Sequence, residues 1–360
     1  MVLAFNRSIF YIFIMFNILW AVPRYALESG TSCNLCHIKP NGGGFRNDYG
    51  IIYGLDDLPA KTPKQFSSYT GLILNHIQFG GDVRIQSVSR NKGDVPSDLA
   101  VFPMQANIQM VYQSAGISVQ SEWALLRKDL GFQLSTRFKD NYIQAGKGKP
   151  AFGLNLADHT VFTRGGNMQL VHGSHREGMP FSPMLNHAPF IAAGRYVGNG
   201  HITVGWSQGY FSSDSESFFA RGEHFGTLGL LNRMIGLSYL QETREPNGLE
   251  MMNIFGGLSR GRIAWLGEVT VADGLVQGRS IASYSELTWR AREGWNVSGR
   301  VDFFDESTFY TKDAIRRTTF GLNYVPFPFV DIKFQIRSSQ LSSGKTSLGL
   351  EYLSQLHVWF

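Results

Sequence analysis

Two cysteines and a histidine stand close together near the start of the chain, and these two cysteines are its only ones. Within SCNLCHIKPNGGGF, two residues separate Cys33 from Cys36, and His37 follows directly. Two thiols at this spacing can reach both vinyl groups of one porphyrin, and the next residue then places an imidazole at the iron. The motif predicts one covalent haem c, with Cys33 and Cys36 as tethers and His37 as the proximal ligand.

Cys33 and Cys36 could also serve a zinc site, a redox pair or a disulfide. A structural zinc site would need a second pair of ligands at similar spacing, and the chain has no further cysteine. A thioredoxin-like redox pair would need a βαβ context, which the glycine-rich surroundings do not offer. A disulfide between Cys33 and Cys36 stays open as the alternative, because exported proteins meet an oxidising compartment.

The motif does not define the sixth ligand of the iron. His76, which is close in sequence, and His159, in LADHTVF, are weak candidates. A five-coordinate haem open to solvent is the alternative. The remaining candidates are His172, His175, His187, His201, His224, His357 and nearby methionines such as Met104.

The first residues predict export. Arg7 precedes an apolar stretch from Ile9 to Val22, which has the length and position of the apolar region of a signal peptide. We expect a signal peptide over residues 1–26, with Ala26 as its last residue. Residues 27–70 are rich in Gly, Asn, Asp and Pro, and they predict a small, irregular haem-binding segment in the periplasm or in a barrel lumen.

From residue 71 to residue 360 the sequence alternates between apolar and polar residues. This period of two predicts long β-strands with one apolar and one polar face. The apolar face of the first strand is expected to carry Ile77, Phe79, Gly81, Val83 and Ile85. The last strand is expected to carry Leu348, Leu350, Tyr352, Leu356, Val358 and Phe360 on one face.

Such strands fit a transmembrane antiparallel β-barrel better than a soluble sandwich. They are long, their polar faces carry charges of both signs, and aromatic residues recur near their ends. The terminal Phe360 resembles the last-strand signal of bacterial outer-membrane barrels. The length predicts about 14 strands, within a range of about 12 to 16, because such barrels have even strand numbers.

Two stretches interrupt the alternation. Residues 146–190 predict a long extracellular loop or a constriction of the lumen, and residues 213–225 predict a second outward loop. The formal charge of +5 comes from scattered residues and forms no basic patch, which argues against nucleic-acid binding.

Residues 26–50, followed by a barrel that contains FGLNLADHTVFTR, resemble Gram-negative outer-membrane β-barrels that carry a cytochrome motif, akin to porins and porin–cytochrome conduits. The resemblance implies an outer-membrane protein in contact with lipid, which takes part in electron transfer through one haem. One haem cannot span a hydrocarbon layer of about 30 Å, so a periplasmic cytochrome is the expected partner.

The alternative function is a porin-like channel for small solutes, in which a Cys33–Cys36 disulfide closes an N-terminal plug. No catalytic triad, metal-ligand cluster or phosphate-binding loop supports an enzyme. The sequence gives no indication of the oligomeric state.

Overall fold

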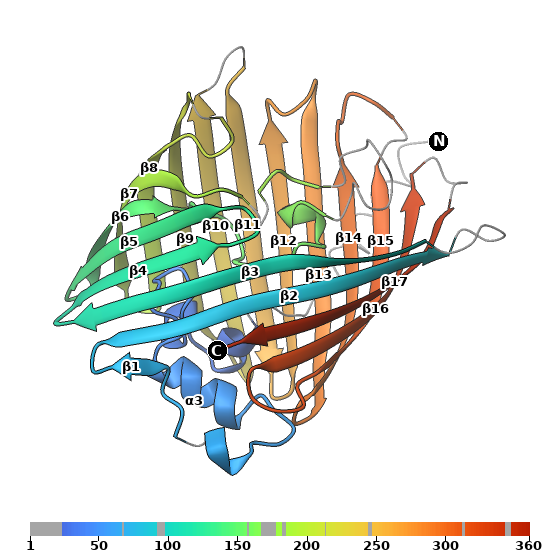
Figure 1. Ribbon diagram of the computed structural model, residues 1–360. Coiled ribbons are helices and arrows are strands. Elements are labelled where there is room, and N and C mark those ends of the chain that lie inside the picture. Colours follow the sequence, from blue (N-terminus) through green and yellow to red (C-terminus); the bar gives the residue numbers. More distant parts are fainter. Residues whose placement is uncertain are drawn as a thin grey trace.

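The alternating segments form one closed antiparallel sheet (Figure 1). The computed structural model describes residues 24–66, 68–91, 98–156, 158–166, 178–181, 185–212, 214–243, 247–311, 314–342 and 347–360. The predicted signal peptide lies outside these residues, except for Arg24 to Ala26, and it stays a prediction.

Seventeen strands form the sheet, of which β1 is a short addition beside β2. Each of the other sixteen pairs with its neighbours in the chain, and β17 pairs with β2, so the all-β barrel is closed. The count is at the upper end of the predicted range, because many connections are tight turns. The strands are β1 (Leu72–Leu74), β2 (Ile77–Asn91), β3 (Asp98–Ser114), β4 (Ile117–Ala124), β5 (Asp129–Phe138), β6 (Asn141–Gly148), β7 (Ala188–Val197), β8 (Gly200–Gln208), β9 (Glu216–Leu228), β10 (Leu231–Thr243), β11 (Leu249–Arg260), β12 (Ile263–Asp273), β13 (Arg279–Arg292), β14 (Trp295–Asp305), β15 (Ile315–Tyr324), β16 (Val330–Leu341) and β17 (Ser347–Trp359).

The two ends of the barrel differ in their connections. At one end, two-residue turns such as Ala115-Gly116, with both residues at positive φ, join β3 to β4 and the other odd–even pairs as far as β13 and β14, and five residues join β15 to β16. At the other end the connections are longer. Outer-membrane barrels place short turns in the periplasm and long loops outside. The tight turns therefore mark the periplasmic end, where Figure 1 also shows α3 and the C-terminus.

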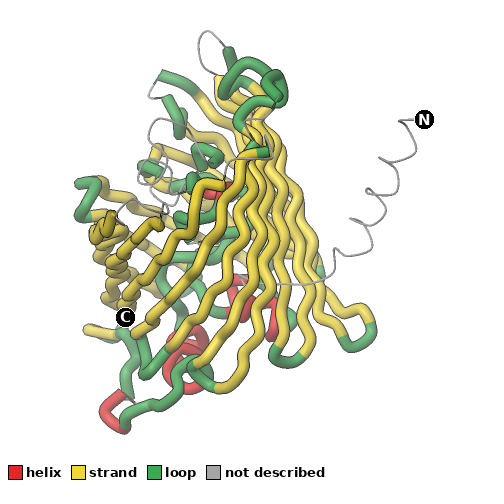
Figure 2. The backbone as a smooth tube through the Cα atoms, turned by 90° about the vertical axis from the view of Figure 1, so that its right-hand side faces the viewer, coloured by secondary structure: helices red, strands yellow, loops and turns green. Residues whose placement is uncertain are grey.

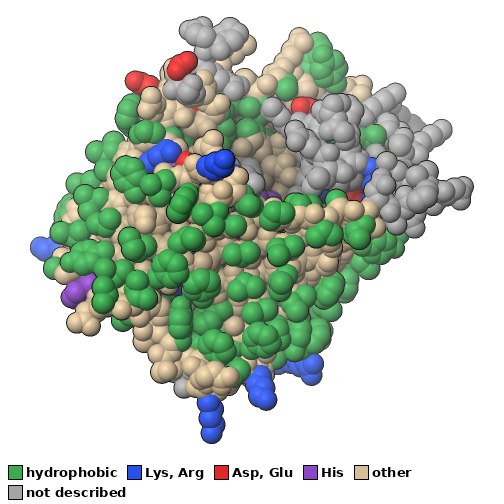
Figure 3. All heavy atoms as spheres, viewed as in Figure 1, with side chains coloured by type: hydrophobic (Ala, Val, Ile, Leu, Met, Phe, Trp, Pro, Cys, Tyr) green, Lys and Arg blue, Asp and Glu red, His purple; other side chains and the backbone are tan. Residues whose placement is uncertain are grey.

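The outer surface of the barrel is apolar, as the alternation predicts. Val83 and Ile85 are 39% and 44% exposed, whereas Arg84 between them is 7% exposed and faces inward. Figure 3 shows hydrophobic side chains spread over the outside of the strands. A closed barrel with this surface is suited to the outer membrane of a Gram-negative bacterium.

The short helices belong to the segment before the barrel and to one loop: α2 (Arg24–Glu28), η1 (Cys33–Leu35), α3 (Asp48–Asp56), η2 (Lys64–Phe66) and η3 (Phe162–Arg164). Figure 2 shows helices near the lower, periplasmic end of the barrel. Among the residues that the structure describes, no helix is both long enough and apolar enough to cross a membrane.

The described residues of the connection between β6 and β7, 149–156, 158–166, 178–181 and 185–187, fold into the lumen; we call them the inward loop. Its described part buries Phe152, Phe162 and Phe181 against side chains of the wall such as Phe219 and Phe304. The described inward-loop residues agree with one of the two predictions for residues 146–190, a constriction of the lumen, whereas 146–148 and 188–190 belong to β6 and β7.

The prediction of an outward loop at residues 213–225 is wrong for most of its length, because β9 begins at Glu216. The inner face of β9 carries Phe219 and Phe225, which pack against the inward loop and its neighbours. Its outer face includes Gly222 and the exposed His224. Because β9 has aromatic residues on its inner face and a glycine and a histidine on its outer face, its sequence does not alternate between apolar outward and polar inward residues.

Candidate functional site

The segment from Arg24 to Phe66 contacts the inner wall of the barrel in its first part, whereas α3 lies at the periplasmic end (Figure 1), and we call the whole segment the plug. Ser259 donates a hydrogen bond to the Leu27 carbonyl (2.9 Å), and Asn232 donates to the Glu28 carbonyl (2.9 Å). The Glu28 carboxylate also pairs with Arg290 at 3.1 Å. These contacts place the start of the predicted segment 27–70 in the lumen.

The Cys33–His37 turn is held by backbone bonds and by one side chain. The Cys36 and His37 amides both donate to the Cys33 carbonyl, at 3.3 and 3.2 Å. Asn47 caps α3 by accepting from the Gly50 amide, and it donates to the Leu35 carbonyl at 2.9 Å. A Cβ at Gly50 would lie 2.1 Å from the Cys36 carbonyl oxygen, so α3 requires glycine there.

The glycine run turns back onto the motif, as its composition predicts. Gly42, Gly43 and Gly44 have φ values of +78°, +76° and +63°, in the left-handed region that favours glycine. A Cβ at Gly42 would lie 2.5 Å from the Cβ of Cys33. The run therefore packs closely against the first cysteine.

Cys33, Cys36 and His37 line one cavity, which we call the plug cavity. It encloses about 1430 Å³, counting the part that is open to the lumen. Polar groups from Arg46, Asp82 and Arg84 also border it. Its apolar wall consists of Tyr25, Ile51, Tyr53, Leu58, Tyr69, Phe329 and Trp359.

The motif histidine is buried beside this cavity. Burial, helped by the charge of Arg46, lowers the pKa of His37 to about 4, so its imidazole is neutral at neutral pH. A neutral imidazole is the form that binds iron. Its Nδ1 atom is buried without a hydrogen-bond partner.

Both cysteines are free thiols in this structure, so hydrogen bonds rather than a disulfide hold the plug. Cys33 is buried, and burial raises its pKa to about 12. Burial also raises the pKa of Cys36. Both groups are therefore neutral thiols at physiological pH. Among the described residues, no cluster of three or more His, Cys, Asp or Glu could hold a metal ion.

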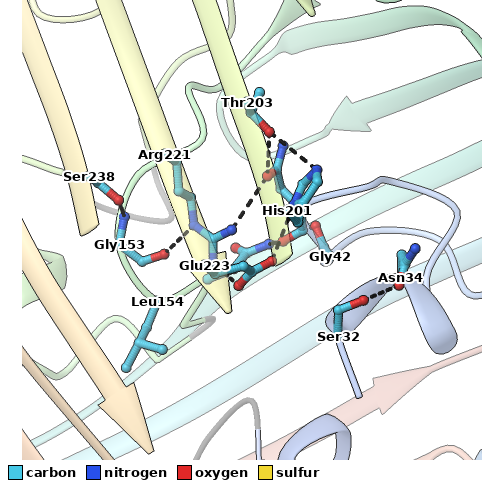
Figure 4. Close-up of polar contacts among 12 residues, drawn as sticks. Ser32, Asn34, Gly42, Gly153, Leu154, His201, Thr203, Arg221, Glu223 and Ser238 are labelled. Carbon is cyan, nitrogen blue, oxygen red and sulfur yellow. Dashed lines mark hydrogen bonds and ion pairs between the residues drawn. The ribbon is translucent and has the colours of Figure 1, made fainter. Parts of the chain in front are cut away.

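A buried polar network joins the plug and the inward loop to the wall (Figure 4). Arg221 of β9 pairs with Glu223 at 2.7 Å and donates to the Gly153 carbonyl at 2.9 Å. Thr203 donates to Asn41 of the plug at 3.0 Å, and His201 lies 3.3 Å from Glu223. Strands β8 and β9 therefore fix both inner segments.

Glu268 of β12 is the main anchor of the inward loop. Its carboxylate accepts from the Leu154 amide at 2.9 Å, from Thr163 at 2.8 Å and from Asn253 at 2.9 Å. It also pairs with the Arg164 guanidinium at 2.5 Å, with both side chains almost fully buried. Loss of this carboxylate would leave the buried Arg164 without its counter-charge.

The lumen keeps open space along the inner face of β3 to β6. A large cavity of about 1300 Å³, counting its open part, lies between this wall, the plug and the inward loop. A cavity of about 350 Å³ and another of about 1160 Å³ follow toward the periplasmic end. The first two share Gln109 and Gln133, and the last is lined by Ser118 and Ser135. We call this series of cavities the wall track.

The two weak candidates for the sixth ligand do not lie on the plug cavity. His76 is exposed in the turn before β2, not on the polar face of the strand, and its ring contacts Tyr112. His159 lies in the inward loop, with its Nε2 atom 3.4 Å from Gln105. His357, another of the candidates, lines the plug cavity together with His37, and His76 lines a second cavity with His37.

Comparison with known proteins shows the fold. OmpT of Vibrio cholerae matches over 79% of this chain and 97% of its own, at a TM-score of 0.56 and 10% identity. An anion-selective porin from Comamonas acidovorans matches over 79% and 98%, at a TM-score of 0.52 and 11% identity. The outer-membrane channel DcaP of Acinetobacter baumannii matches at 0.53 and 10%. No protein-family model and no curated protein matches the sequence.

The chain therefore has the fold of a porin-like outer-membrane β-barrel. This likeness fits the alternative expectation, a porin-like channel, better than it fits electron transfer.

Proposed function

We propose that this protein is a porin-like channel, and not an enzyme, that passes small polar solutes along the wall track. The observation that carries the proposal is a series of three polar cavities along one side of the lumen, from its middle toward the periplasmic turns. On β4 and β5, Gln120 and Gln133 lie one inner-face position above Ser118 and Ser135. The track thus follows consecutive inward side chains.

The lining of the track suits small polar solutes and water. Its upper part carries amide side chains such as Gln105 and Asn107 beside charged ones such as Lys149 and Arg221, and the Nε2 atoms of Gln120 and Gln133 are buried without a protein partner. Buried polar groups of this kind bind water or a passing solute. The middle cavity carries charge of both signs, from Glu122 and from Lys39 and Lys147. It has the smallest volume of the three.

Planar-bilayer conductance tests the channel. The purified wild-type barrel should conduct, and Gln120→Phe should reduce the conductance strongly, because the added ring fills the middle cavity. Val119→Phe is the matched control, since Val119 is the adjacent residue and is 44% exposed on the lipid side. A wild-type barrel that does not conduct would contradict the proposal, and so would equal conductance in the two variants.

A second function, electron transfer through one covalent haem c, is favoured by the plug cavity. Cys33 and Cys36 would tether the group and His37 would ligate its iron. The apolar wall suits a porphyrin, and the buried Nη1 of Arg46, which has no hydrogen-bond partner, suits an acidic side group. When bound, the haem would supply one-electron transfer. The plug lies near the periplasmic end, so a periplasmic cytochrome is the proposed partner.

Covalent haem can be tested on the full-length chain expressed with the c-type maturation machinery. We expect a haem-stained band on a denaturing gel and a c-type pyridine spectrum. Cys33→Ala should lose one thioether bond and most of the stain, whereas Asn34→Ala keeps both thiols and should retain it. In denaturant the wild-type thiols should resist maleimide, because both sulfur atoms are alkylated. A folded barrel with two reactive thiols and no stain would rule this function out.

A further inference from the structure

We propose that a cavity across the lumen from the wall track binds small zwitterionic solutes such as amino acids. This cavity encloses about 1030 Å³, counting its open part, and lies between the inner face of β13 to β17, the plug and the inward loop. We call it the far-wall cavity. The inference goes beyond both functions proposed above, because it requires neither conduction along the wall track nor a bound haem.

Charged groups of both signs line the far-wall cavity, and several of them neutralise each other. Lys333 of β16 donates to the Asp158 carboxylate at 3.4 Å, and Arg84 pairs with Asp82 at 3.1 Å. The Asp158 carboxylate also pairs with Arg300 at 3.2 Å. Because these groups already have counter-charges inside the protein, a ligand has to meet the groups that remain. The charged side chains that line the cavity are Arg24, Arg46, Arg84, Lys333, Asp158, Glu286 and Asp331.

The lining also contains buried donors and acceptors that make no hydrogen bond within the described structure. The donors include Nη1 of Arg46 and Nε1 of Trp359. The acceptors include Oδ1 of Asn323 and Oδ1 of Asp331. Burial lowers the pKa of Arg46 to about 10, so this guanidinium is positively charged at neutral pH. A buried polar group without a partner costs free energy, and a bound ligand supplies the missing hydrogen bond.

These donors and acceptors form two ends of one site. Asn323 lies near the end of β15 and Asp331 near the start of β16, so the two acceptors share the periplasmic end of adjacent strands. Asp331 pairs across the sheet with His357 of β17, whose ring lies 4.7 Å from the Trp359 ring. The guanidinium carbon of Arg46 lies 5.0 Å from the centre of that tryptophan ring. The site therefore has a cationic, donating end and an anionic, accepting end.

An amino acid fits this arrangement of charge. Its carboxylate can accept from Arg46 and Trp359, and its ammonium group can donate to Asp331 and Asn323. Charge-assisted hydrogen bonds of this kind are stronger than neutral ones. A simple anion would leave Asp331 without a counter-charge, and a simple cation would leave Arg46 without one. The apolar part of the lining suits an aliphatic side chain of the ligand, and it consists of residues such as Leu58, Leu156, Leu322 and Val325.

Saturation-transfer NMR tests this site on the full-length protein in detergent micelles, expressed without the c-type maturation machinery. L-alanine is the probe. Propionate and ethylamine are the matched compounds, because each keeps the methyl group and only one of the two charged groups. We expect saturable transfer to the methyl protons of L-alanine and little transfer to those of the other two. No saturable transfer to L-alanine would overturn the proposal, and so would equal transfer to all three compounds.

Two variants assign the binding to the far-wall cavity. Asp331→Asn removes the charge that faces the ammonium group, and Arg46→Gln removes the charge that faces the carboxylate, so each should weaken L-alanine binding about tenfold or more. Asp140→Asn is the matched control, since Asp140 is exposed in the turn between β5 and β6. Unchanged binding in Asp331→Asn would place the ligand elsewhere and overturn the assignment. Should either variant fail to form a heat-modifiable barrel, Trp359→Phe keeps an aromatic ring and loses the N–H group; it should weaken binding, and wild-type affinity in this variant would also overturn the assignment.

Discussion

Replacing Glu268 with alanine releases the inward loop from the wall and increases the conductance of the barrel. The carboxylate accepts hydrogen bonds from the Leu154 amide, Thr163 and Asn253, and it neutralises the buried Arg164. Removing one partner of a buried ion pair leaves an uncompensated charge, which costs about 3–5 kcal/mol. A loss of this size should free the loop more readily than it unfolds the strands.

Two measurements check this result. Bilayer recordings should show a larger and noisier conductance for Glu268→Ala, and gel mobility with and without heating should show that the barrel still forms. Glu216→Ala is the control, because this glutamate is exposed at the start of β9. A folded Glu268→Ala protein with wild-type conductance would show that the inward loop does not limit the route.

Deletion of residues 27–66 should open the lumen and increase the conductance several-fold. The plug fills space that a 16-stranded barrel otherwise leaves to water. The strands close on each other without it, and the groups that hold it, such as Ser259 and Asn232, can bind water once it is gone. We therefore expect the barrel to insert and to conduct.

The comparison for this deletion is the double variant Cys33→Ala and Cys36→Ala, which keeps the plug and removes only its thiols. Its conductance in the apoprotein should match that of the wild type. If the deleted protein does not form a heat-modifiable barrel, the plug is needed for assembly. Unchanged conductance would instead place the narrowest point in the inward loop.

Much of the barrel could be predicted from the sequence because one rule governs most strands. In β2, the alternation separates the lipid-facing Val83 and Ile85 from the inward Arg84, and the structure agrees. The rule fails at β9, where Phe219 points inward to meet the inward loop. Where the inward loop packs against the wall, apolar residues are favoured on the inner face of the strand. The alternation within one strand does not show where such a loop packs.

The residues of the candidate site could be chosen from the sequence, but their surroundings could not. The spacing of Cys33, Cys36 and His37 predicts a haem motif, and this chemistry stays a prediction. The missing information was three-dimensional: the plug lies in the lumen, beside the seam where β17 meets β2. Nothing in the local sequence indicates that contact.

The pairing between β2 and β17 is expected to form late in the assembly of the barrel. The Gly81 and Phe360 amides each donate to the other residue's carbonyl at 3.1 Å, joining the start of the barrel to its final residue. Pairing over so long a stretch of chain is slow, because a long loop must close first. The plug directly precedes β2, so closing the seam encloses it. Cys33 is buried in the finished molecule, so any covalent modification of its thiol has to precede closure of the barrel.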